Sequence, residues 1–313
     1  MSSPKITRRT ALASASALPF AYVAAAAIQP GAARAEGHSA VQPAIQNTFE
    51  LGDFTVSTLL AGSRAVSDVQ TIFGMNVSAE EFADVSAENF IPADQAQFFF
   101  TPTVIRTGSD VVLFDAGLSA GGTLAALNAA GINADDVSIV VLTHMHGDHI
   151  GGLTDDAGTE TFANARYVTG QVEYDHWANA GNDGFDAKVR PLAEKMSFID
   201  HGDDVVSGIT GMAAFGHTPG HMVYRVESNG EGVLLMADTA NHYVWSLGYP
   251  EWEVRFDMDK EAAAQTRKDV LGMVAADRIP LIGYHMPFPG MGYVEEVEQN
   301  RFRYVPVSYQ TLL

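Results

Sequence analysis

Six consecutive residues, His144-Met145-His146-Gly147-Asp148-His149, restrict this chain more than any other feature. They place three imidazoles and one carboxylate directly after the apolar run Val137–Leu142, which is typical of a strand buried on both faces. Histidine and aspartate are costly to bury unpaired, whereas together they form a ligand set for zinc and similar divalent ions. A solvated histidine-rich loop explains this spacing less well. The segment therefore predicts a metal site at the end of a buried strand.

The residues before this motif indicate an α/β fold with a parallel sheet. The segments Phe98–Arg106 and Val111–Phe114 are rich in β-branched and aromatic residues, and Thr107-Gly108-Ser109-Asp110 between them favours a turn, so they predict a hairpin. An alanine-rich stretch that stops at Gly131 predicts a helix before the strand Val137–Leu142. Strand, helix and strand in this order imply a parallel unit whose helix covers the sheet.

The second half of the chain continues this alternation without a fixed-period repeat. Two helices joined by residues 181–186, a hairpin, a helix capped by Asp259 and two late strands are expected. Their ranges are Gln171–Ala180 and Lys188–Phe198, Met222–Val226 and Val233–Met236, the helix through Ala276, and then Ile279–Gly283 and Arg301–Val307. No low-complexity linker divides residues 51–313, so this range is expected to form one domain.

The N-terminus has the layout of an export signal. Residues 1–35 carry four basic residues and no acid, an apolar run from Ala11 to Ile28, and an Ala-Arg-Ala site that ends at Ala35. The pair Arg8-Arg9 resembles a twin-arginine signal, which exports folded proteins. The alternative is a membrane anchor, but Pro19 interrupts the run. We therefore expect a twin-arginine-type signal peptide over 1–35, an N-terminal arm over 36–50, and a periplasmic or secreted protein.

Charge and cysteine content exclude several classes. The chain has 38 acidic and 18 basic residues, a net charge of −20, so nucleic acid is not an expected partner. It contains no cysteine, which excludes disulfides, thiolate ligands and a cysteine nucleophile. Outside residues 1–35 no stretch of 18 apolar residues occurs, and the mature form is expected to have no stable membrane span.

Four motifs in order resemble the metallo-β-lactamase superfamily over nearly the whole mature chain. The hexapeptide matches its HxHxDH motif, and it is followed by Gly216-His217-Thr218-Pro219-Gly220-His221, by Met236-Ala237-Asp238 and by His285 after the strand Leu281–Tyr284. The resemblance implies a four-layer αβ/βα sandwich and two divalent metal ions, for which zinc is favoured although manganese, iron and cobalt accept the same ligands.

The resemblance also implies the role of each residue. His144, His146 and His217 would bind the first metal, Asp148, His149 and His285 the second, and Asp238 would bridge the two. Asp115 and His221 would orient ligands without touching metal.

The chemistry implied is hydrolysis by a hydroxide that bridges the two metals, which needs no serine or cysteine nucleophile. Asp148 is the expected catalytic residue, which would align the hydroxide and pass a proton to the leaving alkoxide. The alternative without catalysis is a zinc-binding protein that uses the same ligands.

Within the superfamily, the export signal, His285-Met286-Pro287-Phe288-Pro289-Gly290 and the ending Arg303-Tyr304-Val305-Pro306-Val307 are similar to methyl parathion hydrolase and its lactonase and arylesterase relatives. We therefore expect a small-molecule lactone or carboxylic (aryl) ester as substrate. Organophosphate triesters are the alternative, a glyoxalase II-like thioesterase is less favoured, and a homodimer is compatible with the resemblance.

Members of this subgroup have an aromatic pocket over the metals. The candidates here are Trp177, which is favoured because it lies in a polar stretch, and a set of further aromatic residues, although strand aromatics more often belong to the core. This set comprises Phe98, Phe99, Phe100, Phe185 and Trp245.

Overall fold

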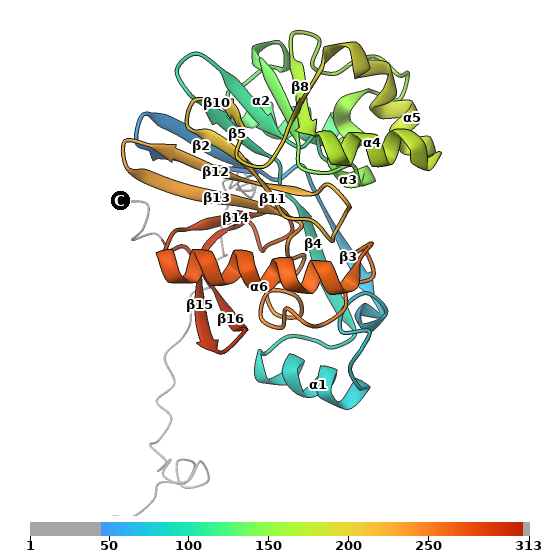
Figure 1. Cartoon of the computed structure of the whole chain (residues 1–313), viewed down its shortest axis with the longest axis vertical. Helices are drawn as coiled ribbons and strands as arrows, with labels where there is room; N and C mark the ends of the chain where they lie inside the picture. Colours follow the sequence, from blue (N-terminus) through green and yellow to red (C-terminus); the bar gives the residue numbers. More distant parts are fainter. Residues whose placement is uncertain (1–44, 309–313) are drawn as a thin grey trace, which may run out of the picture. The chain divides into compact units, whose positions relative to one another are not determined.

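The computed structural model describes residues 45–308, which form two seven-stranded sheets, a two-stranded ribbon and the helices that cover them (Figure 1). The expected signal, residues 1–35, lies outside the described residues, as does most of the expected arm. The arm's last residues belong to β1 (Gln46–Leu51), which pairs antiparallel with the next strand. The first sheet therefore begins before residue 51.

The first sheet combines an antiparallel half with a parallel half. Its strand order is β1-β2-β5-β6-β7-β8-β9, and pairing is parallel from β6 onward. Its remaining strands are β2 (Phe54–Leu59), β5 (Thr103–Arg106), β6 (Val111–Phe114), β7 (Ile139–Leu142), β8 (Arg166–Gly170) and β9 (Met196–Ile199). The hairpin of β5 and β6 and the parallel unit of β6 and β7 confirm the prediction from the sequence.

The second sheet is antiparallel except where β13 and β14 run parallel, with α6 between them in sequence. Asp259 caps α6 as predicted, because its side chain accepts a hydrogen bond from the backbone N–H of Ala262 at 3.0 Å. The elements are β10 (Asp204–Val206), β11 (Ile209–Ala213), β12 (Met222–Ser228), β13 (Glu231–Ala237), α6 (Lys260–Asp277), β14 (Leu281–Gly283), β15 (Met291–Glu298) and β16 (Arg301–Pro306).

The two sheets pack on each other through one shared core. Val56, Val141 and Val168 of the first sheet and Tyr224 and Leu235 of the second belong to a single buried cluster. A second cluster joins the opposite face of the first sheet to α2 (Ala120–Ala129), α4 (Gln171–Ala180) and α5 (Asp183–Lys188), and a third joins the second sheet to α6 (Figure 1). Helix, sheet, sheet and helix form the predicted four-layer αβ/βα sandwich.

A ribbon of two strands, β3 (Gly62–Ser67) and β4 (Gln95–Phe100), extends from the first sheet with α1 (Ala79–Glu88) beside it (Figure 1). The sequence predicted one strand over Phe98–Arg106. The structure divides that range into β4 and β5 at Thr101-Pro102, because proline has no N–H to donate to a sheet. The ribbon thereby leaves the first sheet and approaches the second.

Two further predictions for the region 181–198 are wrong. Residues 181–186 were expected to link two helices, but α5 begins at Asp183, where Asn182 caps it by accepting from the N–H of Phe185. Lys188–Phe198 was expected to be helical, but a 3₁₀ turn (Arg190–Lys195) leads into β9, which completes the sheet edge beside β8. Pairing with the sheet outweighs the weak helical pattern.

The remaining short elements lie in the connections. They are the 3₁₀ turns Val69–Thr71, Ala134–Asp136 and Gly151–Leu153 and the helix α3 (Gly147–Ile150). Among residues 45–308, no helix is both long enough and apolar enough to cross a membrane.

Candidate metal centre

The hexapeptide motif begins two residues beyond the end of β7, a strand whose four residues are all buried. Parallel strands of α/β folds present their functional loops at the carboxyl end, and β7 does so here. His146 precedes the single turn of α3, which turns the chain so that Asp148 and His149 face the same space as His144. Local sequence therefore determines four of the seven candidate ligands.

The other three candidates come from the second sheet. His217 lies between β11 and β12, Asp238 directly follows β13, and His285 lies two residues beyond the end of β14. Ala237, just before Asp238, adopts φ 44°, a left-handed conformation rare for residues with a Cβ atom. This backbone bend directs the Asp238 carboxylate into the space between the sheets' loops.

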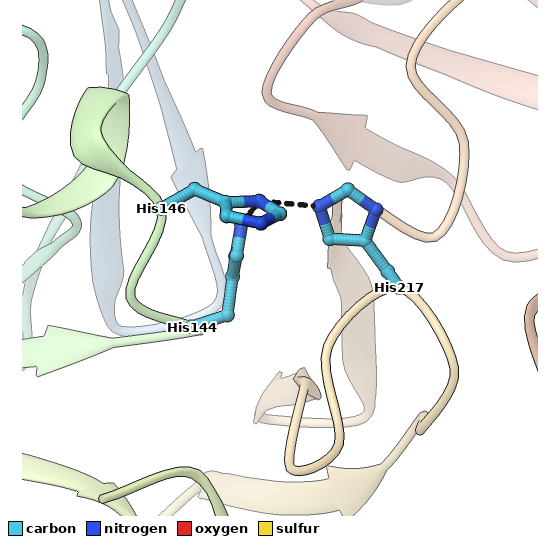
Figure 2. Close-up of side chains that lie close together, drawn as sticks. All are labelled: His144, His146 and His217. Atoms are coloured by element: carbon cyan, nitrogen blue, oxygen red, sulfur yellow. Dashed lines mark hydrogen bonds between the residues drawn. The ribbon is translucent and has the colours of Figure 1, made fainter. Parts of the chain in front are cut away.

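The structure brings all seven residues together in overlapping groups whose ligand atoms lie within 4.8 Å of one another. We call His144, His146 and His217 the imidazole group. In this group His146 Nδ1 lies 3.0 Å from His144 Nε2 and 2.9 Å from His217 Nε2 (Figure 2). Three ring nitrogens that point at one another, rather than at separate acceptors, match the arrangement of ligands around a cation.

We call Asp148, His149 and His285 the carboxylate group. His149 Nε2 and His285 Nε2 lie 3.6 Å and 3.3 Å from Asp148 Oδ2. Asp238 contacts both groups, because its Oδ2 is 3.3 Å from His217 Nε2 and 3.2 Å from His285 Nε2. Its position between the groups suits a carboxylate shared by two ions.

Hydrogen bonds from outside the groups indicate which nitrogen carries a proton in three of the rings. His217 Nδ1 donates to the Asp257 carboxylate at 2.9 Å, His149 Nδ1 donates to Asp115 at 2.9 Å, and His285 Nδ1 donates to the carbonyl of Phe99 at 2.8 Å. Carboxylates and carbonyls only accept, so in the neutral rings the Nε2 lone pairs face inward. Such partners fix ring orientation in protein metal sites.

The pKa values show that the two groups differ in charge. Burial lowers the pKa of His144 well below its usual value and that of His146 to about 3, so the rings stay neutral at pH 7. Burial also opposes charge on His285, but the nearby Asp238 and Asp148 carboxylates outweigh it and raise its pKa to about 10. The carboxylate group therefore favours positive charge, whether it is brought by protons or by a metal ion.

Unsatisfied polar atoms inside the site fit divalent ions. His149 Nε2 and Asp238 Oδ1 are buried without a hydrogen-bond partner in the described structure. Buried polar atoms normally have a hydrogen-bond partner. A metal ion bound among the seven nitrogen and oxygen ligands would satisfy these two atoms. The residues present therefore fit the group of two divalent ions expected from the sequence.

Asp115 and His221 lie where they can orient ligands. Asp115 accepts from the N–H and hydroxyl of Thr143 as well as from His149. His221 Nδ1 donates to the carbonyl of Ala214, and its Nε2 accepts from the N–H of Asp238 at 3.1 Å. Both nitrogens of His221 are thus engaged with the backbone, which leaves neither for a metal.

The sequence analysis missed Glu173, a fully buried carboxylate on α4 that joins two of the motifs. Glu173 accepts from the N–H of Met145 at 2.9 Å in the first motif, and from the hydroxyl of Thr218 at 2.7 Å and the N–H of Gly220 at 2.9 Å in the second. A Cβ at position 220 would lie 2.1 Å from the nitrogen of Glu173, so glycine is required for this approach.

Asp257, Arg267 and Asn241 were also missed. One oxygen of the Asp257 carboxylate accepts a hydrogen bond from His217, and the other accepts one from the buried Arg267 guanidinium at 2.7 Å. Asn241 donates a hydrogen bond to Asp238 at 2.8 Å. No motif marks these residues, because each reaches the site only through contacts between elements far apart in the sequence. The one signal in the sequence was Arg267, an arginine within the mixed polar and apolar sequence of α6.

A cavity of about 270 Å³ opens onto the ligands, and we call it the metal-site cavity. Its wall combines Asp148, Asp238 and His285 with aromatic and aliphatic residues and one arginine. These are Phe98, Phe100, Leu118, Phe256 and Arg64. Phe98 and Phe100 therefore lie where the sequence analysis placed pocket candidates.

Two other pocket candidates lie in the core instead. Trp177 and Phe185 belong to the buried cluster between the first sheet and its helices. The indole N–H of Trp177 donates to Glu173 at 2.6 Å, which accounts for a tryptophan in a polar stretch. Phe99 and Trp245 line a second cavity that shares His285 with the first.

A sequence profile of the metallo-beta-lactamase superfamily (Lactamase_B) matches residues 101–280, more than half of the chain. The chain belongs to the metallo-beta-lactamase superfamily. Its curated relatives match over short stretches: it is 29% identical over 87 residues to the anti-Pycsar protein Apyc1 of Paenibacillus sp. (strain J14), which is 26% of this chain and 34% of that protein. The chain thus spans about a third of the length of this curated relative.

Solved structures of the superfamily match over greater lengths. AidC, described as a dizinc quorum-quenching lactonase, has 24% identity and a TM-score of 0.77, with 84% of this chain and 98% of AidC covered. The hydrolase AbOPH has 23% identity and a TM-score of 0.79, with 86% and 99% covered. At these identities the likeness concerns the fold, and function is argued from the site.

Proposed function

We propose that this protein is a metal-dependent hydrolase that cleaves lactones or carboxylic aryl esters with two divalent ions, of which zinc is favoured. The observation that carries the proposal is the joining of the imidazole and carboxylate groups at Asp238, beneath a cavity with aromatic walls. Two ions held there would lower the pKa of water and polarise the scissile carbonyl.

The chain's own residues would contribute position and proton transfer. Of the two candidate carboxylate ligands, Asp148 has 22% of its side chain exposed and Asp238 has 4%, so Asp148 is the more accessible to a substrate. We propose that Asp148 aligns the attacking water and returns its proton to the leaving alkoxide oxygen. His149 and His285, which both lie close to Oδ2 of Asp148, hold this carboxylate in its ionised form by lowering its pKa to about 2 against the effect of burial.

The walls of the metal-site cavity support a neutral substrate. Phe98, Phe100, Leu118 and Phe256 offer apolar contact to an acyl chain or an aryl leaving group. The strongly negative net charge disfavours nucleic acid. The same walls would also accept a neutral phosphotriester, which makes organophosphate hydrolysis the second candidate. We further propose export by the twin-arginine route, on the basis of residues 1–35.

A substrate panel with and without chelator tests the proposal. It contains an N-acyl homoserine lactone, phenyl acetate, paraoxon and S-lactoylglutathione. We expect the highest kcat/KM with the lactone or the aryl ester and no turnover after metal removal. Preference for the thioester would contradict the substrate class, and bound metal without any turnover would indicate a metal-binding protein.

The role of Asp148 has a separate test. In Asp148→Asn reloaded with metal, the rate should depend more steeply on the pKa of the phenol leaving group than in the wild type, because the acid that protonates it is lost. An unchanged dependence, with the second metal missing, would assign Asp148 to metal binding alone.

A further inference from the structure

A second cavity, of about 370 Å³, lies on the opposite face of β4 from the metal-site cavity, and we call it the outer cavity. Side chains of a strand alternate between its faces. Phe98 and Phe100 line the metal-site cavity, whereas Gln97 and Phe99, from the other face of β4, line the outer cavity together with Ala96. The two cavities therefore adjoin each other along the ribbon, with His285 in both walls.

The walls of the outer cavity are mostly apolar. Ile91, Pro92, Phe99, Trp245 and Pro287 provide aliphatic and aromatic surface. Its polar lining residues are Gln95, Gln97, Tyr243, His242 and the shared His285, and no Asp, Glu, Lys or Arg lines it. A volume of this size with few polar groups is typical of small-molecule sites, and a wall that has no acidic side chain and no basic one other than the shared His285 favours a neutral ligand.

One polar atom, Nε2 of His242, is the group in this wall best placed to orient a ligand. The other ring nitrogen, Nδ1, accepts the backbone N–H groups of Val244 and Trp245, each at 3.2 Å, so it carries no proton. The neutral ring therefore holds its proton on Nε2. Burial lowers the pKa of His242 to about 3, which keeps the ring neutral.

The Nε2–H of His242 has no hydrogen-bond partner among residues 45–308, although 92% of the residue is buried. The ring cannot easily turn to find one. It stacks on Trp245 with centroids 4.0 Å apart and planes 15° apart, and Trp245 is held by its own hydrogen bond to Ser86 at 3.0 Å. The wall thus presents a fixed donor into an apolar cavity.

We propose that the outer cavity binds a small neutral ligand with an aromatic or aliphatic body and one carbonyl or hydroxyl oxygen, which accepts the hydrogen bond from His242 Nε2. This site adjoins the proposed ester-cleaving centre and shares His285 with it, but the proposal does not depend on that centre being active. Because the ligand's oxygen can accept a hydrogen bond from His242 Nε2 that the apolar body cannot make, the oxygen should contribute affinity beyond that of the apolar body.

Two matched probes test the proposal on the metal-loaded full chain. Acetophenone carries a carbonyl on an aromatic ring, and ethylbenzene has a similar shape without the oxygen. Affinities measured by ligand-observed NMR should be about tenfold tighter for acetophenone in the wild type, as expected for one buried hydrogen bond. Equal affinities, or no binding of either probe, would overturn the proposal.

Two variants locate the binding. His242→Phe keeps an aromatic ring against Trp245 and removes the donor, so it should weaken acetophenone about tenfold and leave ethylbenzene unchanged. Ala65→Phe, at an exposed position of β3 that lines the outer cavity, should fill the space and abolish binding of both probes. Ala65→Phe also remains informative should His242→Phe fail to fold. Unaltered binding of both probes to Ala65→Phe would place them elsewhere, such as at the metals, and would contradict the site.

Discussion

The imidazole group and the carboxylate group both contain histidine rings, but the two groups differ in the charge around the carboxylates that hydrogen-bond to these rings from outside. Behind His217, the Asp257 carboxylate is neutralised by the buried Arg267 at 2.7 Å. Behind His149, the Asp115 carboxylate is held by the neutral Thr143 and meets no cation other than the histidine itself among the described residues. Asp257 mainly orients the ring of His217, whereas Asp115 orients the ring of His149 and also adds negative charge to the site.

The difference suggests that the two metal positions are supported in different ways. The carboxylate group, with Asp148 inside and Asp115 behind, attracts a cation by charge. The imidazole group relies on geometry, because Glu173 holds the loops that carry its rings and Asp257 holds the ring of His217. Perturbations of charge should therefore affect the carboxylate group, and perturbations of packing should affect the imidazole group.

Removal of both metals should have the largest effect. Dialysis against a chelator should abolish hydrolysis and lower Tm by roughly 5–15 °C, because the orphaned ligand atoms remain buried without partners. Activity assays and calorimetry before and after added zinc measure this. Full activity in protein shown to be metal-free would refute the proposed chemistry for both groups.

Asp238→Asn should have the next largest effect, since Asp238 contacts both groups. Loss of its charge should reduce kcat/KM by about 1000-fold or more, equivalent to several kcal/mol of transition-state stabilisation. Metal analysis should show fewer than two ions per chain. Asn241→Ala, which removes only the hydrogen bond to Asp238, is the milder control.

Asp115→Asn and Asp257→Asn compare the two groups directly. Partners of metal-bound histidines typically contribute 10–100-fold in affinity, and we expect about 100-fold for Asp115→Asn and about 10-fold for Asp257→Asn. Asp257→Asn should instead unfold more easily, because it leaves Arg267 buried without its counter-charge. Metal titrations and urea unfolding separate these effects, and the reverse order of affinities would invalidate the comparison.

Glu173→Gln should have a moderate effect on the imidazole group. The amide nitrogen would face donors from Met145, Thr218, Gly220 or Trp177, so at least one hydrogen bond is lost at a cost of about 1–3 kcal/mol. Metal affinity should fall at the imidazole group more than at the carboxylate group. Equal losses at both groups would show that α4 supports the site as a whole.

Trp177→Phe should have the smallest effect. It removes one hydrogen bond to Glu173 at about 1 kcal/mol and should leave KM for an aryl ester unchanged, because Trp177 lies in the core. Phe98→Leu, in the wall of the metal-site cavity, is the matched variant and should raise KM. A raised KM in Trp177→Phe alone would restore the pocket role that the sequence suggested.

The sequence by itself determined the superfamily, the sandwich and the seven candidate ligands. Four of these residues lie in six positions, and the others follow strands with recognisable apolar patterns, so local spacing was sufficient to place them. Metal chemistry restricts the ligands to a few residue types, which makes such motifs readable without knowledge of the packing.

Only the tertiary structure decided what holds these ligands and what surrounds them. Glu173 and Asp257 act through hydrogen bonds to residues far along the chain, and Trp177 was assigned to the core rather than to the pocket. The outer cavity exists because β4 leaves the first sheet at Thr101-Pro102 and turns one face away from the metals. The burial of a side chain and the hydrogen bonds that hold the ligands in place depend on how elements pack, and no local pattern of residues encodes them.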